Sequence, residues 1–161
     1  MRKPLRFEGT VRINAPRAAV WELIADVATL ERLIPSIKQA ETIVPLTQFK
    51  VAVSMPFWVQ SHQQTFHITW SNVTISRYFD WVAKTSWADQ PIETYGELQL
   101  SDDTTLTFSA EVAPPSNAPP SQLLHRIIEQ AIRSYFVSLK QEAELDHATS
   151  LRLATRLDLR T

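Results

Sequence analysis

An arginine on an otherwise apolar strand face is the residue whose type and position most suggest ligand chemistry. From Val73 to Trp87 the sequence alternates as one long strand, and Arg77 is the one charged residue on its odd-numbered face. A guanidinium in an apolar cavity can bind a carboxylate, a phenolate or another anionic group. Because arginine is seldom buried without a partner, a break in the strand register or an ion pair with a nearby acid is the alternative.

Aromatic residues gather on the same predicted strands, and a few polar residues share their faces. Flat rings suit a pocket for an apolar or lipid-like ligand, which also needs a polar group to orient it. For any single ring, packing in the core is the alternative. His62 and Gln64 share a strand face with Phe66 and are candidate polar partners. The predicted ligand-binding residues are Arg77, His62, Gln64, Phe66, Trp70, Phe79, Trp81, Phe108, Ile128 and Tyr135.

Metal binding and the common catalytic motifs are not indicated. His62 and His67 are five residues apart on a strand, so they point to opposite faces and cannot chelate one metal ion. The chain has no cysteine and only two glycines, which excludes a thiol nucleophile and a glycine-rich phosphate loop. We therefore expect no metal and no cofactor, and a binding protein in preference to an enzyme.

Composition limits the classes of partner. The 161 residues carry a net charge of −1, and the stretch from Val51 to Ala113 holds two basic residues, Arg77 and Lys84, against seven acidic ones. A nucleic-acid partner is not expected, because phosphate binding needs clustered lysine and arginine. No window reaches the roughly 18 apolar residues of a membrane-spanning helix, and no signal peptide is apparent. We expect a cytoplasmic protein.

The order of predicted elements is a strand, two short helices, a run of strands and a long helix. Residues 5–13 alternate as a half-buried strand, and Pro16 suits the start of the first helix. A long C-terminal helix follows four prolines between Ala113 and Ser121, and its apolar stripe can cover one face of the sheet. The further strands are predicted at residues 37–44, 49–55, 60–70, 73–87, 94–100 and 104–112.

Residues 1–147 are predicted to form a single domain, followed by a tail at residues 148–161. In this tail the leucines fall on odd positions and the charges on even positions, which favours an added strand. Arg152, Arg156 and Arg160 also align at i, i+4, so a helix is the alternative. The tail is a candidate contact for a protein partner or for a second copy of the chain.

This order of elements resembles that of the START-like, or polyketide-cyclase-like (SRPBCC), superfamily over about residues 5–145. Within it, the chain looks most like the G-subunit-like proteins of carbon monoxide dehydrogenase. The residues that carry this closer resemblance are Ile13-Asn14-Ala15-Pro16, Val20-Trp21, Asp26, Leu30, Ile34-Pro35 and Tyr135-Phe136. The resemblance implies an α+β helix-grip fold, in which a curved antiparallel sheet of about six to seven strands wraps around the long C-terminal helix and two short helices follow the first strand.

The resemblance also implies an apolar cavity between the sheet and the long helix. The first hypothesis is that this cavity binds or carries a small hydrophobic molecule or lipid. The second is an enzyme of the cyclase, aromatase or dehydratase kind, in which one polar residue shuttles a proton. The third is an accessory protein that docks on a larger complex through its tail. The fold by itself does not decide among them.

Overall fold

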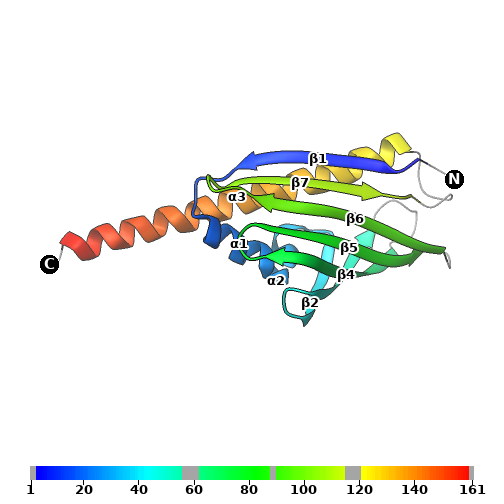
Figure 1. Cartoon of the computed structure of the whole chain (residues 1–161), viewed down its shortest axis with the longest axis horizontal. Helices are drawn as coiled ribbons and strands as arrows, with labels where there is room; N and C mark the ends of the chain where they lie inside the picture. Colours follow the sequence, from blue (N-terminus) through cyan, green and yellow to red (C-terminus); the bar gives the residue numbers. More distant parts are fainter. Residues whose placement is uncertain (1–2, 56–61, 88–89, 115–120, 160–161) are drawn as a thin grey trace.

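A seven-stranded antiparallel sheet forms the body of the protein (Figure 1). The computed structural model describes residues 3–55, 62–87, 90–114 and 121–159. The strand order is β1-β7-β6-β5-β4-β3-β2, so the first strand pairs with the last and the chain otherwise meanders between neighbours. The strands are β1 (Leu5–Arg12), β2 (Ile37–Val44), β3 (Gln48–Met55), β4 (His62–Thr74), β5 (Tyr78–Trp87), β6 (Gln90–Leu100) and β7 (Thr105–Val112).

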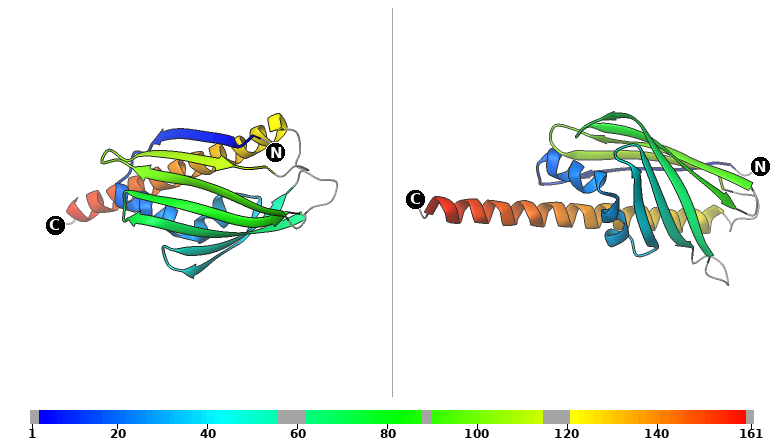
Figure 2. Two further views of the ribbon diagram at one scale, coloured as in Figure 1. Left: turned by 45° about the vertical axis from the view of Figure 1, so that its right-hand side comes forward. Right: turned by 90° about the horizontal axis from the view of Figure 1, so that it is seen from below.

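Three helices lie on one face of this sheet, and the longest runs along it from end to end. The helices are α1 (Arg17–Ala25), α2 (Val27–Leu33) and α3 (Ser121–Leu159). The sheet curves around α3, which Figure 2 shows most clearly from below. The Asp26 side chain separates the two short helices, because it accepts a hydrogen bond from the Ala28 N–H at 3.1 Å and caps α2. The predicted helix-grip fold, with two short helices after the first strand, is confirmed.

Hydrogen bonds of two charged residues fix α3 to the connection between β1 and α1. Lys140 Nζ donates to the Arg12 carbonyl oxygen at 2.7 Å and to Glu144 Oε1 at 2.6 Å. The same Glu144 oxygen accepts the Asn14 N–H at 3.0 Å. The ammonium group of Lys140 and the Asn14 N–H together hold the pKa of Glu144 below its usual range, so this carboxylate stays charged.

The predicted strand over residues 73–87 is wrong, because the chain turns within it. β4 ends at Thr74 and β5 begins at Tyr78, and the Arg77 N–H donates to the Thr74 carbonyl oxygen at 2.9 Å across the turn. Ser76 makes the turn with a left-handed φ of 65°. Because this conformation is usual for glycine and uncommon for serine, the sequence carries no clear turn signal at this point.

The added strand predicted in the tail is also wrong. Residues 148–159 continue α3 without a break, so the alternative based on the i, i+4 arginines is correct. The Thr155 hydroxyl donates to the Leu151 carbonyl oxygen at 3.0 Å, a contact one helical turn apart. No glycine or proline follows Pro120, and the helix therefore has no residue type that would end it.

Candidate functional site

The inner face of the sheet, which faces α3, is closely packed at the end next to α1. Phe79, Leu98, Leu100 and Leu106 are buried there. They pack into one cluster with residues of the helices, namely Val20, Trp21, Ile24, Leu139 and Ala143. This end of the interface is filled by protein side chains.

Trp70 and Phe79 belong to this packed end. Their rings stack with centroids 3.8 Å apart and planes 13° apart. The indole of Trp21 lies 5.8 Å from the Phe79 ring with an edge-on geometry, and Phe49 lies 4.7 Å from Trp70. Both predicted ligand-binding rings therefore pack in the core, which was the alternative for any single ring.

Further from α1, the residues of the inner face are less completely buried. Side chains here lie on inward-facing positions of the strands or on the apolar stripe of α3, yet they are only half-buried. The strand positions follow from the register, in which Trp81 lies opposite Gly96 and Thr94 lies opposite Val112. The open inner wall consists of Gln64, Phe66, Trp81, Ile92, Thr94 and Val112 from the sheet, and Ile128, Ala131 and Tyr135 from α3.

Contacts between backbones agree with this division. Among the described residues, the main backbone contacts of α3 are with β1, α1 and α2, and not with the central strands β4, β5 and β6. Ile128 and Tyr135 lie seven residues apart on one face of α3, which corresponds to about 10 Å along the helix. The central strands and this part of α3 thus form two walls, and the side chains between them remain partly accessible.

A fixed amide supplies a polar group on the open inner wall. Gln64 Nε2 donates to the Thr85 hydroxyl oxygen at 2.5 Å and also to the Ser86 carbonyl oxygen. The Thr85 hydroxyl in turn donates to the Thr65 carbonyl oxygen at 2.7 Å. The Gln64 carbonyl oxygen has no donor among the described residues, so the amide is oriented by its NH₂ group and keeps a free acceptor.

Tyr135 supplies a second polar group. Burial raises the pKa of its hydroxyl well above the usual value of 10.0, so the side chain is protonated at neutral pH and acts as a hydrogen-bond donor. Its ring also packs against the buried cluster at the α1 end of the interface, and its centroid lies 5.3 Å from that of the Phe136 ring. Tyr135 therefore stands at the boundary between the filled and the open part of the interface.

Two glycines allow aromatic rings to lie close to the sheet. A Cβ atom on Gly96 would lie 2.8 Å from the Trp81 indole and would overlap the Ser109 carbonyl oxygen. A Cβ atom on Gly9 would overlap the Phe108 ring. The Phe108 ring lies over Gly9 and packs at a tilt against the Phe136 ring, with centroids 4.5 Å apart, which places it at the seam between the sheet and α3.

Five of the ten predicted residues lie at half-buried positions of the inner sheet face or of α3: Gln64, Phe66, Trp81, Ile128 and Tyr135. The structure places Phe108 at the neighbouring seam, and Arg77 outside the site altogether. Arg77 lies in the β4–β5 turn, where its half-exposed side chain pairs with Asp102 at 3.3 Å. The side chain of His62 lies outside the described residues.

Thr85 is the functional candidate that the prediction missed. It lies on the same odd-numbered strand face as Phe79 and Trp81, and its hydroxyl positions the Gln64 amide. A threonine in a run of apolar residues on an inward face was the available signal. Within the described ranges, no group of three or more histidine, aspartate or glutamate side chains is arranged to hold a metal ion.

A curved antiparallel sheet that wraps a long C-terminal helix, with two short helices after the first strand, defines a START-like helix-grip protein. The family described as "Polyketide cyclase / dehydrase and lipid transport" matches residues 4–144, and the chain belongs to this family. No protein of curated function is significantly similar to it in sequence. None of the described helices is both long enough and apolar enough to cross a membrane.

Solved structures share the fold at low sequence identity. A conserved protein from Geobacillus kaustophilus is 15% identical with a TM-score of 0.72, and the match covers 89% of this chain and 97% of that protein. A START superfamily protein from Mycobacterium smegmatis is 14% identical with a TM-score of 0.62, over 87% and 97% of the two chains. The Zhui aromatase/cyclase from Streptomyces sp. R1128 is 16% identical with a TM-score of 0.65, over 88% and 94%. The closer resemblance to the G-subunit-like proteins of carbon monoxide dehydrogenase stays a prediction.

Proposed function

We propose that the protein binds and carries a small apolar ligand between the open inner wall of the sheet and α3. The observation that carries this proposal is the contrast between the two ends of one interface. The end next to α1 is filled, whereas Phe66 of the sheet and Ile128 of α3 remain half-buried further along the interface. Trp81 and Tyr135 are half-buried at the margin of the filled cluster. An apolar ligand would remove these surfaces from water, which contributes about 25 cal/mol for each Å² buried.

The polar groups of the wall favour a ligand with a neutral polar end. Gln64 offers a carbonyl acceptor, Tyr135 offers a hydroxyl donor, and neither carries a charge at neutral pH. Arg77, the predicted partner of an acidic ligand, is 54% exposed and paired with Asp102 at the far turn. A hydroxyl, ketone or amide group on an otherwise apolar molecule therefore fits the described wall better than a carboxylate does.

Cyclase or dehydratase chemistry on the same wall is the second candidate. It is supported by the description of the family. The raised pKa of Tyr135 argues against this residue as the proton donor, because a hydroxyl that holds its proton more tightly is a weaker general acid. The two candidates differ in outcome, because a carrier returns its ligand unchanged whereas an enzyme releases a different molecule. Chemical analysis of the extracted ligand before and after incubation with the purified protein separates them.

The experiment that tests the carrier proposal measures ligand occupancy directly. Native mass spectrometry of the protein from its own host, with solvent extraction, is combined with binding of the neutral fluorophore N-phenyl-1-naphthylamine. The variant A131W fills the space between the walls and is expected to abolish both the bound mass and the fluorescence. The matched control A154W places the same side chain on an exposed position of the same helix and is expected to bind as the native protein does.

A second variant tests the class of ligand. Gln64→Leu replaces the oriented amide by an apolar side chain of similar volume. It is expected to weaken the binding of a ligand that has a polar end, and to leave the binding of an unsubstituted hydrocarbon unchanged. The proposal is wrong if the native protein carries no ligand and excludes the fluorophore. It is equally wrong if A131W and A154W bind the fluorophore alike.

A further inference from the structure

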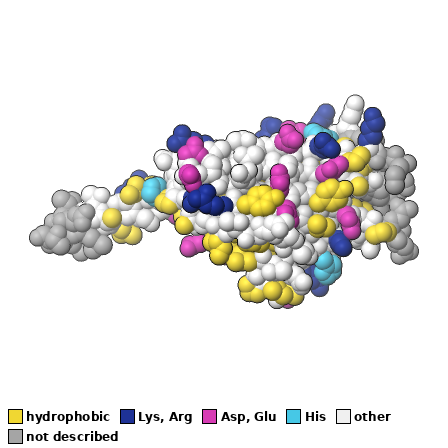
Figure 3. Space-filling view, in the orientation of Figure 1, with side chains coloured by type: hydrophobic (Ala, Val, Ile, Leu, Met, Phe, Trp, Pro, Cys, Tyr) yellow, Lys and Arg dark blue, Asp and Glu magenta, His cyan; other side chains and the backbone are white. Residues whose placement is uncertain are grey.

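The C-terminal part of α3 projects beyond the body of the protein (Figures 1 and 2). The last described contacts of α3 with the body are those of Glu142, Ala143 and Glu144. We call residues 145–156 the α3 extension. Leu145, Leu151 and Leu153 in it are 66%, 56% and 54% exposed. Figure 3 shows hydrophobic side chains on this projecting end, where no other described element covers them.

The extension also presents two exposed arginines one helical turn apart. Arg152 and Arg156 are separated by four residues, which is about 6 Å along a helix. None of the described ion pairs involves either of them. A helix with exposed leucines and basic residues suits a partner surface that is acidic and partly apolar.

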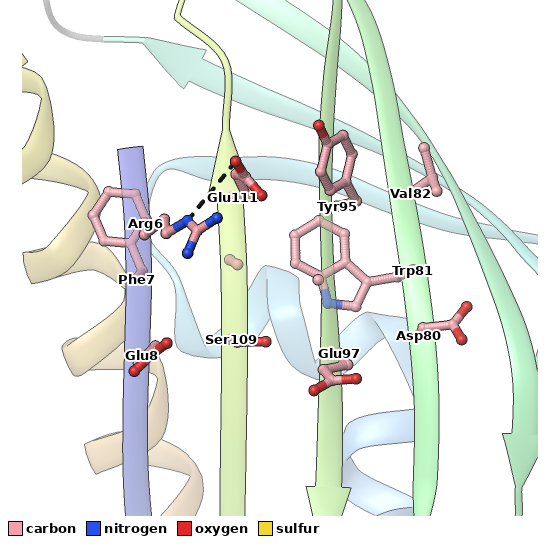
Figure 4. A pocket seen from close by; sticks show the side chains of 12 residues that line it. Arg6, Phe7, Glu8, Asp80, Trp81, Val82, Tyr95, Glu97, Ser109 and Glu111 are labelled. Atoms are coloured by element: carbon pink, nitrogen blue, oxygen red, sulfur yellow. Dashed lines mark ion pairs between the residues drawn. The ribbon is translucent and has the colours of Figure 1, made fainter. Parts of the chain in front are cut away.

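Such a surface lies on the outer face of the sheet, opposite to α3. A shallow pocket of about 390 Å³ lies there over strands β1, β7, β6 and β5 (Figure 4). The strand register aligns the outward side chains in two parallel rows across these strands. The first row is Glu8, Ser109, Glu97 and Asp80, and the second row is Arg6, Glu111, Tyr95 and Val82. We call these eight residues the outer acidic pocket.

Charge and shape in the outer acidic pocket complement those of the extension. It holds four carboxylates and one cation, Arg6, which lies 3.9 Å from Glu111. Tyr95 is 45% exposed and Val82 adjoins it, so the second row also offers apolar surface. The hydroxyl of the neighbouring Tyr78 donates to Glu97 at 3.0 Å, and Glu97 can accept further hydrogen bonds.

The spacing of the two surfaces also agrees. Residues two apart on a strand are about 6.8 Å apart, so the two rows are separated by nearly the 6 Å between Arg152 and Arg156. Four strands span about 14 Å, which accommodates a helix 10–12 Å wide. A helix that lies along the strands can therefore direct one arginine at each row while a leucine contacts Tyr95.

The extension of the same chain does not reach this pocket, because α3 lies on the other face of the sheet and points away from it. We propose that the α3 extension of one copy docks on the outer acidic pocket of a second copy, with Arg152 and Arg156 against its carboxylates and a leucine against Tyr95. Both complementary surfaces belong to this chain and no described element covers either of them, which favours a second copy over a different partner. The contact is independent of the ligand proposed for the inner wall.

Sedimentation velocity on the full chain, over a concentration series at low and high salt, tests the proposal. The native protein is expected to associate, and salt is expected to weaken the association because exposed charges form it. The double variant R152E/R156E and the double variant E8K/E111K are each expected to lose the associated species. An equimolar mixture of the two variants is expected to regain it, because the exchanged charges match again. R126E, an exposed arginine of α3 outside the extension, is the matched control and is expected to associate normally.

The mixture is also a control for misfolding, because two unfolded variants would not restore a specific complex. The proposal is overturned if the native protein is a monomer throughout the series. It is also overturned if the mixture of charge-exchanged variants stays monomeric. Binding of the extension to anionic phospholipid vesicles by a protein that stays monomeric would assign the extension to a membrane surface instead.

Discussion

The Arg77 guanidinium and the Asp102 carboxylate join two turns of the sheet, with Nη2 and Oδ1 3.3 Å apart. The same Asp102 oxygen lies 2.7 Å from Nη1 of Arg17 at the start of α1. Asp102 thus links the β4–β5 turn to the first helix, at the filled end of the interface. An arginine that was expected to bind a ligand instead forms part of a surface ion-pair network.

Removing this arginine should leave ligand binding unchanged. Arg77→Ala is expected to lower the free energy of unfolding by less than about 1 kcal/mol, because an exposed ion pair contributes little. Asp102→Asn should have the larger effect of the two, since it weakens the contacts of both arginines. Urea denaturation gives the stabilities, and native mass spectrometry gives the occupancy. A loss of bound ligand in Arg77→Ala alone would contradict the placement of this residue.

Gly96 should tolerate alanine less well than Gly9 does. A methyl group on Gly96 meets the Ser109 carbonyl oxygen as well as the Trp81 indole, whereas on Gly9 it meets only the Phe108 ring. Backbone moves less readily than a side chain, so Gly96→Ala is expected to cost about 1–3 kcal/mol and Gly9→Ala clearly less. Urea denaturation compares the two variants. A shift in tryptophan fluorescence only in Gly96→Ala would locate the effect at Trp81.

Tyr78 should make stability depend on pH in the alkaline range. Burial, then the hydrogen bond to Glu97 and the charges of Glu97 and Asp80, raise the pKa of Tyr78 from 10.0 to about 12. Because the folded state holds this proton more tightly than the unfolded state, its contribution is complete below pH 10 and is lost as the pH rises from 10 to about 12.

The measurement is urea denaturation through this range, together with tyrosinate absorbance. Tyr78→Phe is the matched control and should show a smaller loss of stability between these pH values. Equal slopes for the native protein and Tyr78→Phe would show that Glu97 and Asp80 do not hold the proton of this hydroxyl.

Ser76→Gly should stabilise the protein. Ser76 has a left-handed φ of 65°, which costs an L-residue about 1–2 kcal/mol relative to glycine, while glycine loses part of this gain through chain entropy. The expected net gain is about 0.5–1 kcal/mol. Ser71→Gly, at an exposed position within β4, is the matched control and should lower stability. Thermal unfolding shows whether each substitution raises or lowers the stability. A loss of stability in both variants would contradict the turn geometry.

The fold could be predicted because its sheet and helices have strong and distinct periodicities. The alternation of β1 and β7 and the apolar stripe of α3 are visible in the sequence without knowledge of tertiary contacts. Residues 148–159 could not be assigned in this way, because leucines at alternate positions and arginines at i, i+4 are both present. Tertiary packing does not determine whether these residues form a strand or a helix either, since the extension contacts no other described element.

The site could be predicted only in part, because burial depends on packing that a single strand does not reveal. Trp70, Phe79 and Trp81 all lie on the inner face, and Trp21 of α1 packs against the rings of the first two. Trp81 lies at the margin of the same cluster and stays half-buried. Arg77 was misplaced because the turn at Ser76 uses no glycine and preserves the alternation on both sides of it. Thr85 was missed because its role depends on Gln64 of the neighbouring strand.

One uninterrupted helix carries both the proposed ligand-binding residues Ile128 and Tyr135 and the projecting Leu151 and Leu153. From Leu139, where α3 is fully buried, to its described end is about 30 Å. A tilt of α3 by about 5° around that point, as a bulkier ligand would require, would move the far end by roughly 2–3 Å. Under the two proposals, the size of the bound ligand would therefore change the position of the surface that α3 offers to a second copy.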